Sequence, residues 1–389
     1  MTNNFFLSNA NNLKGKRVLV RVGVNVPLDE KGNIESDFRL KAVLPTLKFL
    51  IDKKAKIILI GHIGRDSNLT LKKIFKYFKK KEKLPISFDE KTFVNFNNQK
   101  VEELKSQISS MKKGEILFLD NLRATDLEKE NNVLFAKNLS EFADVYVNEA
   151  FSVSHRKHAS ISELPKNFTE KYFGIQFEKE LEFLNKIKEL KKESNSIFVL
   201  GGAKIKSKLP ILDILTDKFD KVIVGGAIIN NFYKFLGYEI GNSVYDKEEM
   251  DLQKYIDKKN LFIPNLVIVK NKKGKVEKEI SEVNKDDKIL DISPSSFLEI
   301  EKELKEAKII FFNGPLGYYE GGFKDGTKYL FEILANKENL FIAGGGNTSS
   351  VIYEMGLGEN VDFISTGGGS LVEYIAHGTL LGIEAIINK

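Results

Sequence analysis

The chain of 389 residues contains no cysteine and no tryptophan, and histidine, arginine and proline are scarce. Without cysteine there is no disulfide, no thiolate-bound metal and no thiol nucleophile. The four histidines show no zinc-ligand spacing on a predicted helix. No apolar run in the sequence approaches the ~18 residues of a transmembrane helix, and the N-terminus lacks the regions of a signal peptide. We therefore expect a cytoplasmic protein with no membrane partner.

The sequence also has no large excess of positive or negative charge. The 60 basic and 54 acidic residues give a net charge of +6, spread evenly along the chain. This balance does not predict binding to nucleic acid, although small polyanions remain possible ligands. Hydrophobic residues make up 42% and charged residues 29%, which is typical of a globular protein. At roughly 100–200 residues per domain, the length predicts two or three domains.

Arginine provides only six of the 60 basic residues, and all six lie within the first 156 residues. They are Arg17, Arg21, Arg39, Arg65, Arg123 and Arg156. A guanidinium group can hold a phosphate or carboxylate through two parallel hydrogen bonds, whereas an ammonium group is only a point charge. Because lysine provides almost all other basic residues, the few arginines indicate positions that need the two parallel hydrogen bonds of a guanidinium group. The alternative is chance scatter; clustering in one half favours an anion site there.

Short apolar runs alternate with amphipathic stretches in the first half of the chain. The pattern predicts buried strands and helices in alternation, hence a parallel sheet covered on both faces. The predicted strands are 17–26, 56–60, 115–119 and 144–147, and the predicted helices are 39–51, 71–77 and 127–142. A long helix rich in glutamate and lysine is predicted at 177–194, near mid-chain, where it would connect two domains.

In the second half, five predicted strands run directly into glycine. They are 197–200, 222–224, 309–312, 340–343 and 363–366. In an open parallel sheet, ligands bind outside the carboxyl ends of the strands. Glycines there let the backbone approach a ligand and expose amide N–H groups that suit phosphate. One glycine pair would indicate only a tight turn, but five along one edge predict a nucleotide or phosphate site.

These glycine turns match none of the common nucleotide or acyl-transfer motifs. The dinucleotide fingerprint G-x-G-x-x-G, the P-loop, the protein-kinase motifs and G-x-S-x-G are all absent. What remains is a first half suited to an anionic acceptor and a second half suited to a nucleotide. A two-substrate enzyme of this kind would align the reacting groups and expel water when it closes.

Eight segments, in order along the whole chain, resemble motifs of the phosphoglycerate kinases. In the first half these are RVGVNVPL at 21–28, GHIGR at 61–65, DNLR at 120–123 and VNEAFSVSHRKHAS at 147–160, the last similar to V-N-D-A-F-G-x-x-H-R-x-H-A-S. In the second half they are GGAKIKSK at 201–208, NGPLGYYE at 313–320, GGGNT at 344–348 and STGGG at 365–369. Arg39 also stands at the Arg-bearing helix start of the family.

The resemblance implies an α/β fold of two doubly wound, Rossmann-like parallel-sheet domains joined by a long connecting helix. The implied limits are 1–172 for the acceptor domain, 173–192 for the helix, 193–377 for the nucleotide domain and 378–389 for a segment that returns to the first domain. The implied reaction is reversible phosphoryl transfer between 1,3-bisphosphoglycerate and ADP, giving 3-phosphoglycerate and ATP with Mg²⁺. The self-contained plan, without a heptad seam, favours a monomer.

The resemblance also implies roles for single residues. Acceptor binding falls to Gly23, Val24, Asn25, Arg39, His62, Ile63, Gly64, Arg65, Arg123 and Arg156. Nucleotide binding falls to Gly202, Lys204, Lys208, Gly225, Gly226, Asn313, Glu320, Gly346, Asn347, Thr348 and Ser349. Contact with the transferring phosphoryl group falls to Arg39, Lys204, Gly345 and Gly368. His62 is expected to donate a hydrogen bond and not to act as a base.

Two positions depart from the family pattern where the chemistry takes place. Gly23 replaces an aspartate that would accept a hydrogen bond from the substrate hydroxyl, so a water or a shifted group must take its place. Asn347 replaces an aspartate that serves the magnesium, so weaker magnesium–nucleotide binding is expected. Besides an active enzyme, two alternatives follow: an impaired relative that still binds nucleotide, and a kinase for another small phosphorylated acid.

Overall fold

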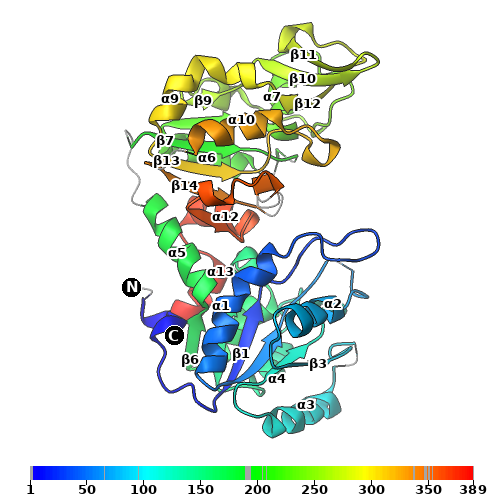
Figure 1. The fold of residues 1–389 in the computed structure, drawn as a ribbon, viewed down its shortest axis with the longest axis vertical. Helices are drawn as coiled ribbons and strands as arrows, with labels where there is room; N and C mark the ends of the chain where they lie inside the picture. Colours follow the sequence, from blue (N-terminus) through cyan, green and yellow to red (C-terminus); the bar gives the residue numbers. More distant parts are fainter. Residues whose placement is uncertain are drawn as a thin grey trace. The chain divides into compact units, whose positions relative to one another are not determined.

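The computed structural model of the chain describes residues 3–64, 66–94, 96–188, 194–203, 205–206, 208–335, 338–345, 348, 351–352 and 354–388. The chain forms two compact units, of which unit 1 comprises Met1–Leu184 with His377–Lys389 and unit 2 comprises Asn185–Ala376. Each unit is built on a six-stranded parallel sheet with helices around it (Figure 1). The predicted class, α/β with two parallel-sheet domains, is confirmed.

The sheet of unit 1 has the strand order β3-β4-β2-β1-β5-β6. Its strands are β1 (Arg17–Val22), β2 (Lys56–Ile60), β3 (Ile86–Asp89), β4 (Ile116–Leu119), β5 (Val145–Glu149) and β6 (Glu170–Phe173). The central strands are buried on both faces, as continuous apolar runs predict. Two edge strands, β3 and β6, were not predicted, because each has only four residues and a mixed polar pattern.

The main helices of unit 1 are α1 (Phe38–Asp52), α2 (Lys72–Lys76), α3 (Asn98–Ser110), α4 (Val133–Ser140), α5 (Ile175–Lys188) and α13 (Leu381–Ile387). The helix predicted at 127–142 is wrong in its first part, because α4 begins only at Val133. The side chain of Asn132 accepts a hydrogen bond from the backbone N–H of Phe135 at 2.9 Å and so caps the helix there. Asn131, with φ of 57°, turns the chain just before this cap.

A buried carboxylate fixes the start of α5. Glu149, at the end of β5, accepts hydrogen bonds from the Thr46 hydroxyl at 2.8 Å and from the backbone N–H groups of Gln176 at 3.0 Å and Phe177 at 3.3 Å. Burial raises the pKa of Glu149 to about 8, and these three donors oppose that shift. A carboxyl oxygen at a helix N-terminus satisfies amide groups that the helix itself leaves unpaired. The first turn of the mid-chain helix is thus hydrogen-bonded to Glu149 at the end of β5.

The C-terminal segment packs on unit 1 as helix α13, drawn in red (Figure 1). The Lys171 ammonium on β6 donates to the carbonyls of Ala385 at 2.9 Å and Asn388 at 2.8 Å. Of the four apolar residues expected to face the first domain, Leu380, Ile383 and Ile386 are buried. Leu381 is 39% exposed.

Unit 2 has a second parallel sheet, in the order β15-β14-β13-β7-β8-β9. The strands are β7 (Ser196–Leu200), β8 (Lys221–Val224), β9 (Leu261–Phe262), β13 (Ile309–Asn313), β14 (Leu340–Gly344) and β15 (Phe363–Ser365). Helices described in this part of the chain are α6 (Leu209–Lys218), α7 (Ile229–Phe235), α8 (Gln253–Ile256), α9 (Glu301–Glu306), α10 (Asp325–Leu334) and α12 (Gly369–His377). Within the described ranges, no single helix is long and apolar enough to cross a bilayer, although α12 and α13 taken together pass that test by length and composition.

Unit 2 also contains a small antiparallel sheet that the sequence analysis did not predict. Its strands are β10 (Leu266–Asn271), β11 (Gly274–Glu279) and β12 (Lys288–Ile292), in the order β11-β10-β12. A two-residue turn joins β10 to β11, and side chains along β11 alternate between half-buried and exposed. Alternation of lysine and glutamate on an exposed strand gives little apolar signal.

Each sheet has a pair of adjacent strands from which the following connections leave in opposite directions. In unit 1 this reversal point lies between β1 and β5, and in unit 2 it lies between β7 and β13. Ligands of doubly wound sheets bind beyond the carboxyl ends of the strands at such points. The segments that begin at Gly23, Ala150, Gly201 and Gly314 follow these four strands and therefore occupy the expected ligand positions.

Candidate functional site: an anion clamp and a glycine-lined edge

In unit 1, hydrogen bonds connect several of the predicted acceptor residues. Asn25 is central, because its side-chain oxygen accepts from the backbone N–H of Gly64 at 2.7 Å and its carbonyl accepts from the Arg39 guanidinium at 2.6 Å. The carbonyl of Gly64 accepts in turn from the Arg123 guanidinium. Segments that follow β1, β2 and β4 are thereby held together at the carboxyl edge of the sheet.

The backbone conformation favours glycine at position 64. Its φ is +64°, and a Cβ atom there would lie 2.2 Å from Cδ1 of Leu69. The next loop supports the same region, because Asn121 accepts from the N–H of Ile63 at 3.3 Å and donates to the carbonyl of Ile63 at 3.2 Å. The side chains of Ile63 and Val24 are buried in the core. Both residues were predicted as contacts of the acceptor, a role that stays a prediction.

Arg21 is a site residue that the motif analysis did not assign. It lies on β1, is fully buried, and places Nη2 2.8 Å from Nδ1 of His62. His62, which follows β2, is itself 2% exposed. The signal available in the sequence was the scarcity of arginine together with a guanidinium in the middle of an apolar strand.

The electrostatics of this region favour an anionic ligand. Burial, and then the charges of Arg21, Arg123 and Arg156, hold the pKa of His62 well below its usual range. Burial lowers the pKa of Arg39, as does the charge of Arg156, whereas Glu180 raises it. Groups of positive charge that act on one another at short range are compensated when an anion binds among them.

The loop after β5 brings further donors to the same edge. Arg156 is exposed, and its Nε lies 3.4 Å from Nε2 of His155. Burial lowers the pKa of His155 and of His158 to about 4, with Arg156 among the secondary causes for both. Three of the four arginines predicted to converge, Arg39, Arg123 and Arg156, thus act on one region. The fourth, Arg65, lies outside the described residues.

In unit 2, the glycine turns pack backbone against backbone. A Cβ atom at Gly201 would lie 2.3 Å from the carbonyl oxygen of Pro315, and one at Gly226 would lie 2.6 Å from the nitrogen of Gly202. Leu316 accepts from the N–H of Gly226 at 2.9 Å. No side chain fits between these segments, which explains glycine after β7 and β8. Gly225 is equally constrained, since a Cβ there would lie 2.3 Å from Cδ2 of Leu316.

Asn313 has an unused donor at the reversal point of this sheet. The residue is 5% exposed, and its Nδ2 is buried without a hydrogen-bond partner among the described residues. Its Oδ1 lies 3.5 Å from the ammonium of Lys208, whose pKa is lowered by burial. A buried amide donor beside a poorly solvated ammonium is suited to an anionic oxygen.

The last two glycine turns meet near the same edge. Gly314 donates to the Thr348 hydroxyl at 2.9 Å, and Gly345 donates to the carbonyl of Gly367 at 2.9 Å. Gly345 has a φ of +103°, and a Cβ at Gly368 would lie 3.5 Å from its Cα. Glu320, on the short turn Tyr319–Gly321, is exposed. Four predicted nucleotide residues lie outside the described residues, namely Lys204, Gly346, Asn347 and Ser349.

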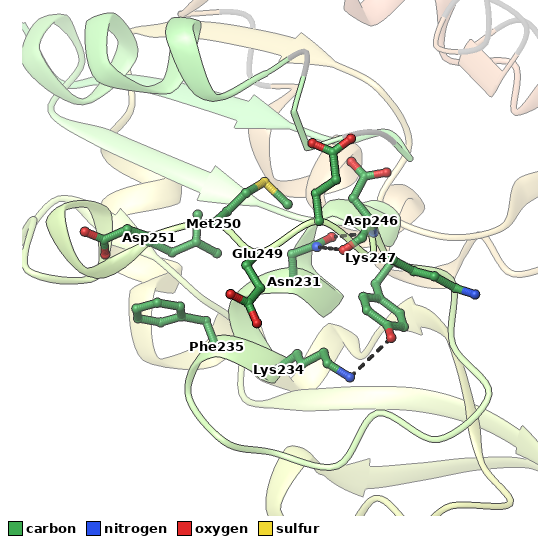
Figure 2. Close-up of a pocket in the computed structure, with 11 residues that line it drawn as sticks. Asn231, Lys234, Phe235, Asp246, Lys247, Glu249, Met250 and Asp251 are labelled. Atoms are coloured by element: carbon green, nitrogen blue, oxygen red, sulfur yellow. Dashed lines mark hydrogen bonds between the residues drawn. The ribbon is translucent and has the colours of Figure 1, made fainter.

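A cavity of about 440 Å³ lies elsewhere in unit 2, beside α7. Its walls are the side of α7 that carries Asn231 and Phe235, and the loop 245–252 (Figure 2). Asn231 donates to the carbonyl of Asp246 at 2.9 Å, which holds this loop against the helix. None of the predicted site residues lines the cavity, and exposed charged side chains form much of its rim.

One unit therefore carries a cluster of guanidinium groups at a sheet edge, and the other carries glycine turns with buried donors at a second sheet edge. This combination defines a class: two-domain α/β phosphotransferases that work by positioning and charge compensation. The family model described as phosphoglycerate kinase matches residues 8–377. The chain belongs to the phosphoglycerate kinase family.

Individual phosphoglycerate kinases are similar in sequence to this chain over nearly its full length. A phosphoglycerate kinase of Dictyoglomus turgidum is 36% identical over 97% of this chain and 97% of its own. One of Coprothermobacter proteolyticus is 35% identical over 96% and 97%. Among solved structures, the phosphoglycerate kinase of Pyrococcus horikoshii has a TM-score of 0.83 at 27% identity, covering 98% of both chains. That of Coxiella burnetii has a TM-score of 0.77 at 29% identity, with the same coverage.

Proposed function

We propose that the protein catalyses reversible phosphoryl transfer between 1,3-bisphosphoglycerate and ADP, giving 3-phosphoglycerate and ATP. The observation that carries this proposal is the linked cluster of Asn25, Arg39, Gly64 and Arg123, with His62 and Arg156 acting on the same region. A cluster of this charge at a strand-order reversal is suited to a ligand that carries both a phosphate and a carboxylate.

In the ATP-forming direction, an oxygen of the ADP β-phosphate attacks the phosphorus of the acyl phosphate. The bond between that phosphorus and the carboxyl oxygen breaks, and the carboxylate of 3-phosphoglycerate leaves with the electron pair. Neither step needs a proton, because the attacking oxygen is already ionised. The protein therefore contributes position and positive charge, which is what phosphoryl transfer requires.

Unit 1 would hold the acceptor through Arg39, Arg123 and Arg156, with His62 as a neutral donor. Arg39 would face the transferring group, and one of its guanidinium nitrogens donates to the carbonyl of Asn25 at 2.6 Å. Unit 2 would hold ADP through the backbone N–H groups of its glycine turns, the amide of Asn313 and the ammonium of Lys208. Lys204, Gly345 and Gly368 are proposed to contact the phosphoryl group in transfer.

Mg²⁺ is proposed to bind together with the nucleotide. Within the described ranges, no group of three or more histidine, aspartate or glutamate side chains could hold a metal ion. Nucleotide phosphates would then supply most of the charged oxygen ligands, with Asn347 as a neutral protein ligand. When bound, the ion would neutralise negative charge on the phosphate chain.

A coupled assay tests the proposal. Purified protein with 1,3-bisphosphoglycerate, ADP and Mg²⁺ should form ATP, and omission of either substrate should abolish the signal. In Asn313→Ala, the KM for ADP should rise severalfold while the KM for the acyl phosphate stays unchanged. Asn260→Ala is the matched control, since its amide only binds the carbonyls of Thr216 and Phe219. Absence of turnover with intact ADP binding would leave the impaired relative as the function.

The same proposal includes a monomeric, cytoplasmic enzyme whose partners are small molecules. Each unit has its own sheet and buried core. Light scattering at the concentration of the assay would show a mass near the 44.1 kDa of one chain. A mass twice as large would overturn the monomer without affecting the chemistry.

A further inference from the structure

A buried chain of hydrogen bonds lies behind the acceptor site of unit 1. Glu128 is 1% exposed, and its two carboxylate oxygens accept from the Ser160 hydroxyl at 2.6 Å and the Ser160 N–H at 2.9 Å. The Ser160 hydroxyl also lies 2.9 Å from Nε of Arg21. Nη1 of Arg21 donates to the carbonyl of Val22, and Nη2 lies 2.8 Å from Nδ1 of His62.

The direction of every bond in this chain follows from the chemistry of the groups. A guanidinium can only donate, and an ionised carboxylate can only accept. The Ser160 hydroxyl therefore gives its single proton to Glu128 and accepts from Arg21. At the other end of the chain of hydrogen bonds, Nδ1 of His62 must be the acceptor, because the Arg21 guanidinium is the donor. A proton on that nitrogen would set two donors 2.8 Å apart.

The state of the His62 ring follows from this. With Nδ1 as the acceptor, a neutral ring carries its proton on Nε2, and the doubly protonated imidazolium is excluded. Within the residues the structure describes, Nε2 forms no hydrogen bond, and His62 as a whole is 2% exposed. His62 lies two residues after the end of β2, in the segment 61–64 that also provides Gly64 to the arginine cluster.

We propose that Arg21 is a positioning residue for the acceptor site: held by Ser160 and Glu128, it fixes His62 as the Nε2–H tautomer, so that this histidine is a permanent hydrogen-bond donor. Arg21 itself does not touch the substrate in this account. The inference rests on the proposed function only for the identity of the anion that Nε2–H would bind. The tautomer itself depends on this chain alone.

The first test is direct. Long-range ¹H–¹⁵N NMR of the full chain with ¹⁵N-labelled histidine rings distinguishes the two tautomers, and the four histidines are few enough to assign by single substitutions. At neutral pH, His62 should show a bare Nδ1 and a protonated Nε2. A protonated Nδ1 would overturn the proposal, whether or not the protein proves to be a kinase. Correct tautomer without any turnover would instead contradict the proposed function.

The second test compares two arginines on the same strand. Arg21→Lys keeps the charge but cannot reach Ser160, Val22 and His62 at once. We expect mixed tautomers of His62 and a loss of about tenfold in kcat/KM for 3-phosphoglycerate, with the KM for ATP unchanged, from a charge-assisted hydrogen bond to the ligand. Arg17→Lys, whose side chain pairs with Asp144 at 2.6 Å, should leave both unchanged.

Two further variants keep the proposal testable if Arg21→Lys does not fold. Ser160→Ala removes one bond of Arg21 and should also produce mixed tautomers. His62→Asn keeps an acceptor for Arg21 but removes the Nε2–H donor, so it should fold and lose a similar factor in kcat/KM for 3-phosphoglycerate. Unchanged kinetics in a folded His62→Asn protein would overturn the role of this donor.

Discussion

The hydroxyl oxygen of Ser152 lies 3.4 Å from the position that a Cβ atom would take at Gly23. Both residues lie at the reversal point of the first sheet, since Gly23 follows β1 and Ser152 belongs to the short helix Phe151–Val153 after β5. Position 23 has lost the aspartate of the family motif, and position 152 carries serine where that motif has glycine. Ser152 is half-buried, and its hydroxyl forms no hydrogen bond with the residues described in the structure.

Ser152 is therefore expected to bond the C2 hydroxyl of the acceptor in place of the lost carboxylate. Ser152→Ala should lower kcat/KM for 3-phosphoglycerate about 2- to 10-fold, as expected for one neutral hydrogen bond of ~0.5–1.5 kcal/mol. The substitution should have no effect on an analogue that lacks the C2 hydroxyl. Equal losses on both substrates would show a structural role instead. Gly23→Asp should fold, because the contacts of its Cβ at 3.4–3.5 Å are ordinary.

Arg39→Lys should reduce activity far more than the retained charge suggests. The guanidinium is fixed at one arm by the carbonyl of Asn25 at 2.6 Å, and a lysine cannot keep that bond and hold a ligand as well. We expect a fall of roughly 10- to 100-fold in kcat/KM, equivalent to ~1.5–3 kcal/mol for a charge-assisted bond. Arg17→Lys is the control, because its partly exposed pair with Asp144 at 2.6 Å affects stability by ~1 kcal/mol at most. Similar activity losses in the two variants would contradict the anion clamp.

Acid should destabilise unit 1 through its histidines. Burial lowers the pKa of His155 and of His158 to about 4, against about 6.5 in an unfolded chain. Because the neutral form is favoured in the fold, their contribution to stability is complete above pH ~6.5 and declines as the pH falls towards 4. Urea unfolding at pH 7 and pH 5 should show a smaller loss in the double variant His155→Gln/His158→Gln than in the parent. Equal losses would contradict this origin, and the exposed His377→Gln serves as the control.

Restoring a carboxylate at position 347 should lower the magnesium requirement. A negative group beside a divalent ion in a partly enclosed site attracts it more strongly than a neutral amide does. Asn347→Asp should therefore reach half-maximal activity at a lower Mg²⁺ concentration, with little gain in metal-free nucleotide binding. Asn347→Ser, neutral and smaller, is the matched control. An unchanged or higher magnesium requirement in Asn347→Asp would mean that the site is adapted to asparagine.

Buried apolar strands and long motifs made much of this fold predictable. The strand at 56–60 agrees with β2 in both bounds, and α1 differs from its prediction by one residue at each end. Weak apolar patterns were missed, as in β3, β6 and the antiparallel strands β10–β12. The first turns of the helix predicted at 127–142 do not form, because the asparagines at 131 and 132 turn and cap the chain. Periodicity alone does not register a cap inside an amphipathic stretch.

For the candidate site too, some features could be predicted from the sequence and others could not. Motif positions predicted Asn25, Arg39, Gly64 and Arg123, and hydrogen bonds bring these four together. The tertiary relationships were not predictable. Arg21 meets His62 across neighbouring strands, and Ser160 meets Glu128 from 32 positions away. Such pairs depend on sheet register and burial, which a single sequence does not specify.

Trapping of the reaction product tests the central claim most directly. Protein, ATP labelled at the γ-phosphorus, 3-phosphoglycerate, Mg²⁺ and hydroxylamine are incubated together, since hydroxylamine converts an acyl phosphate into a hydroxamate and free phosphate. If the protein is a phosphoglycerate kinase, the hydroxamate of 3-phosphoglycerate should form, with ADP and labelled phosphate in equal amounts, and none of these should form without 3-phosphoglycerate. A protein that binds ATP yet forms no hydroxamate, or forms one only from a different acid, would contradict this claim.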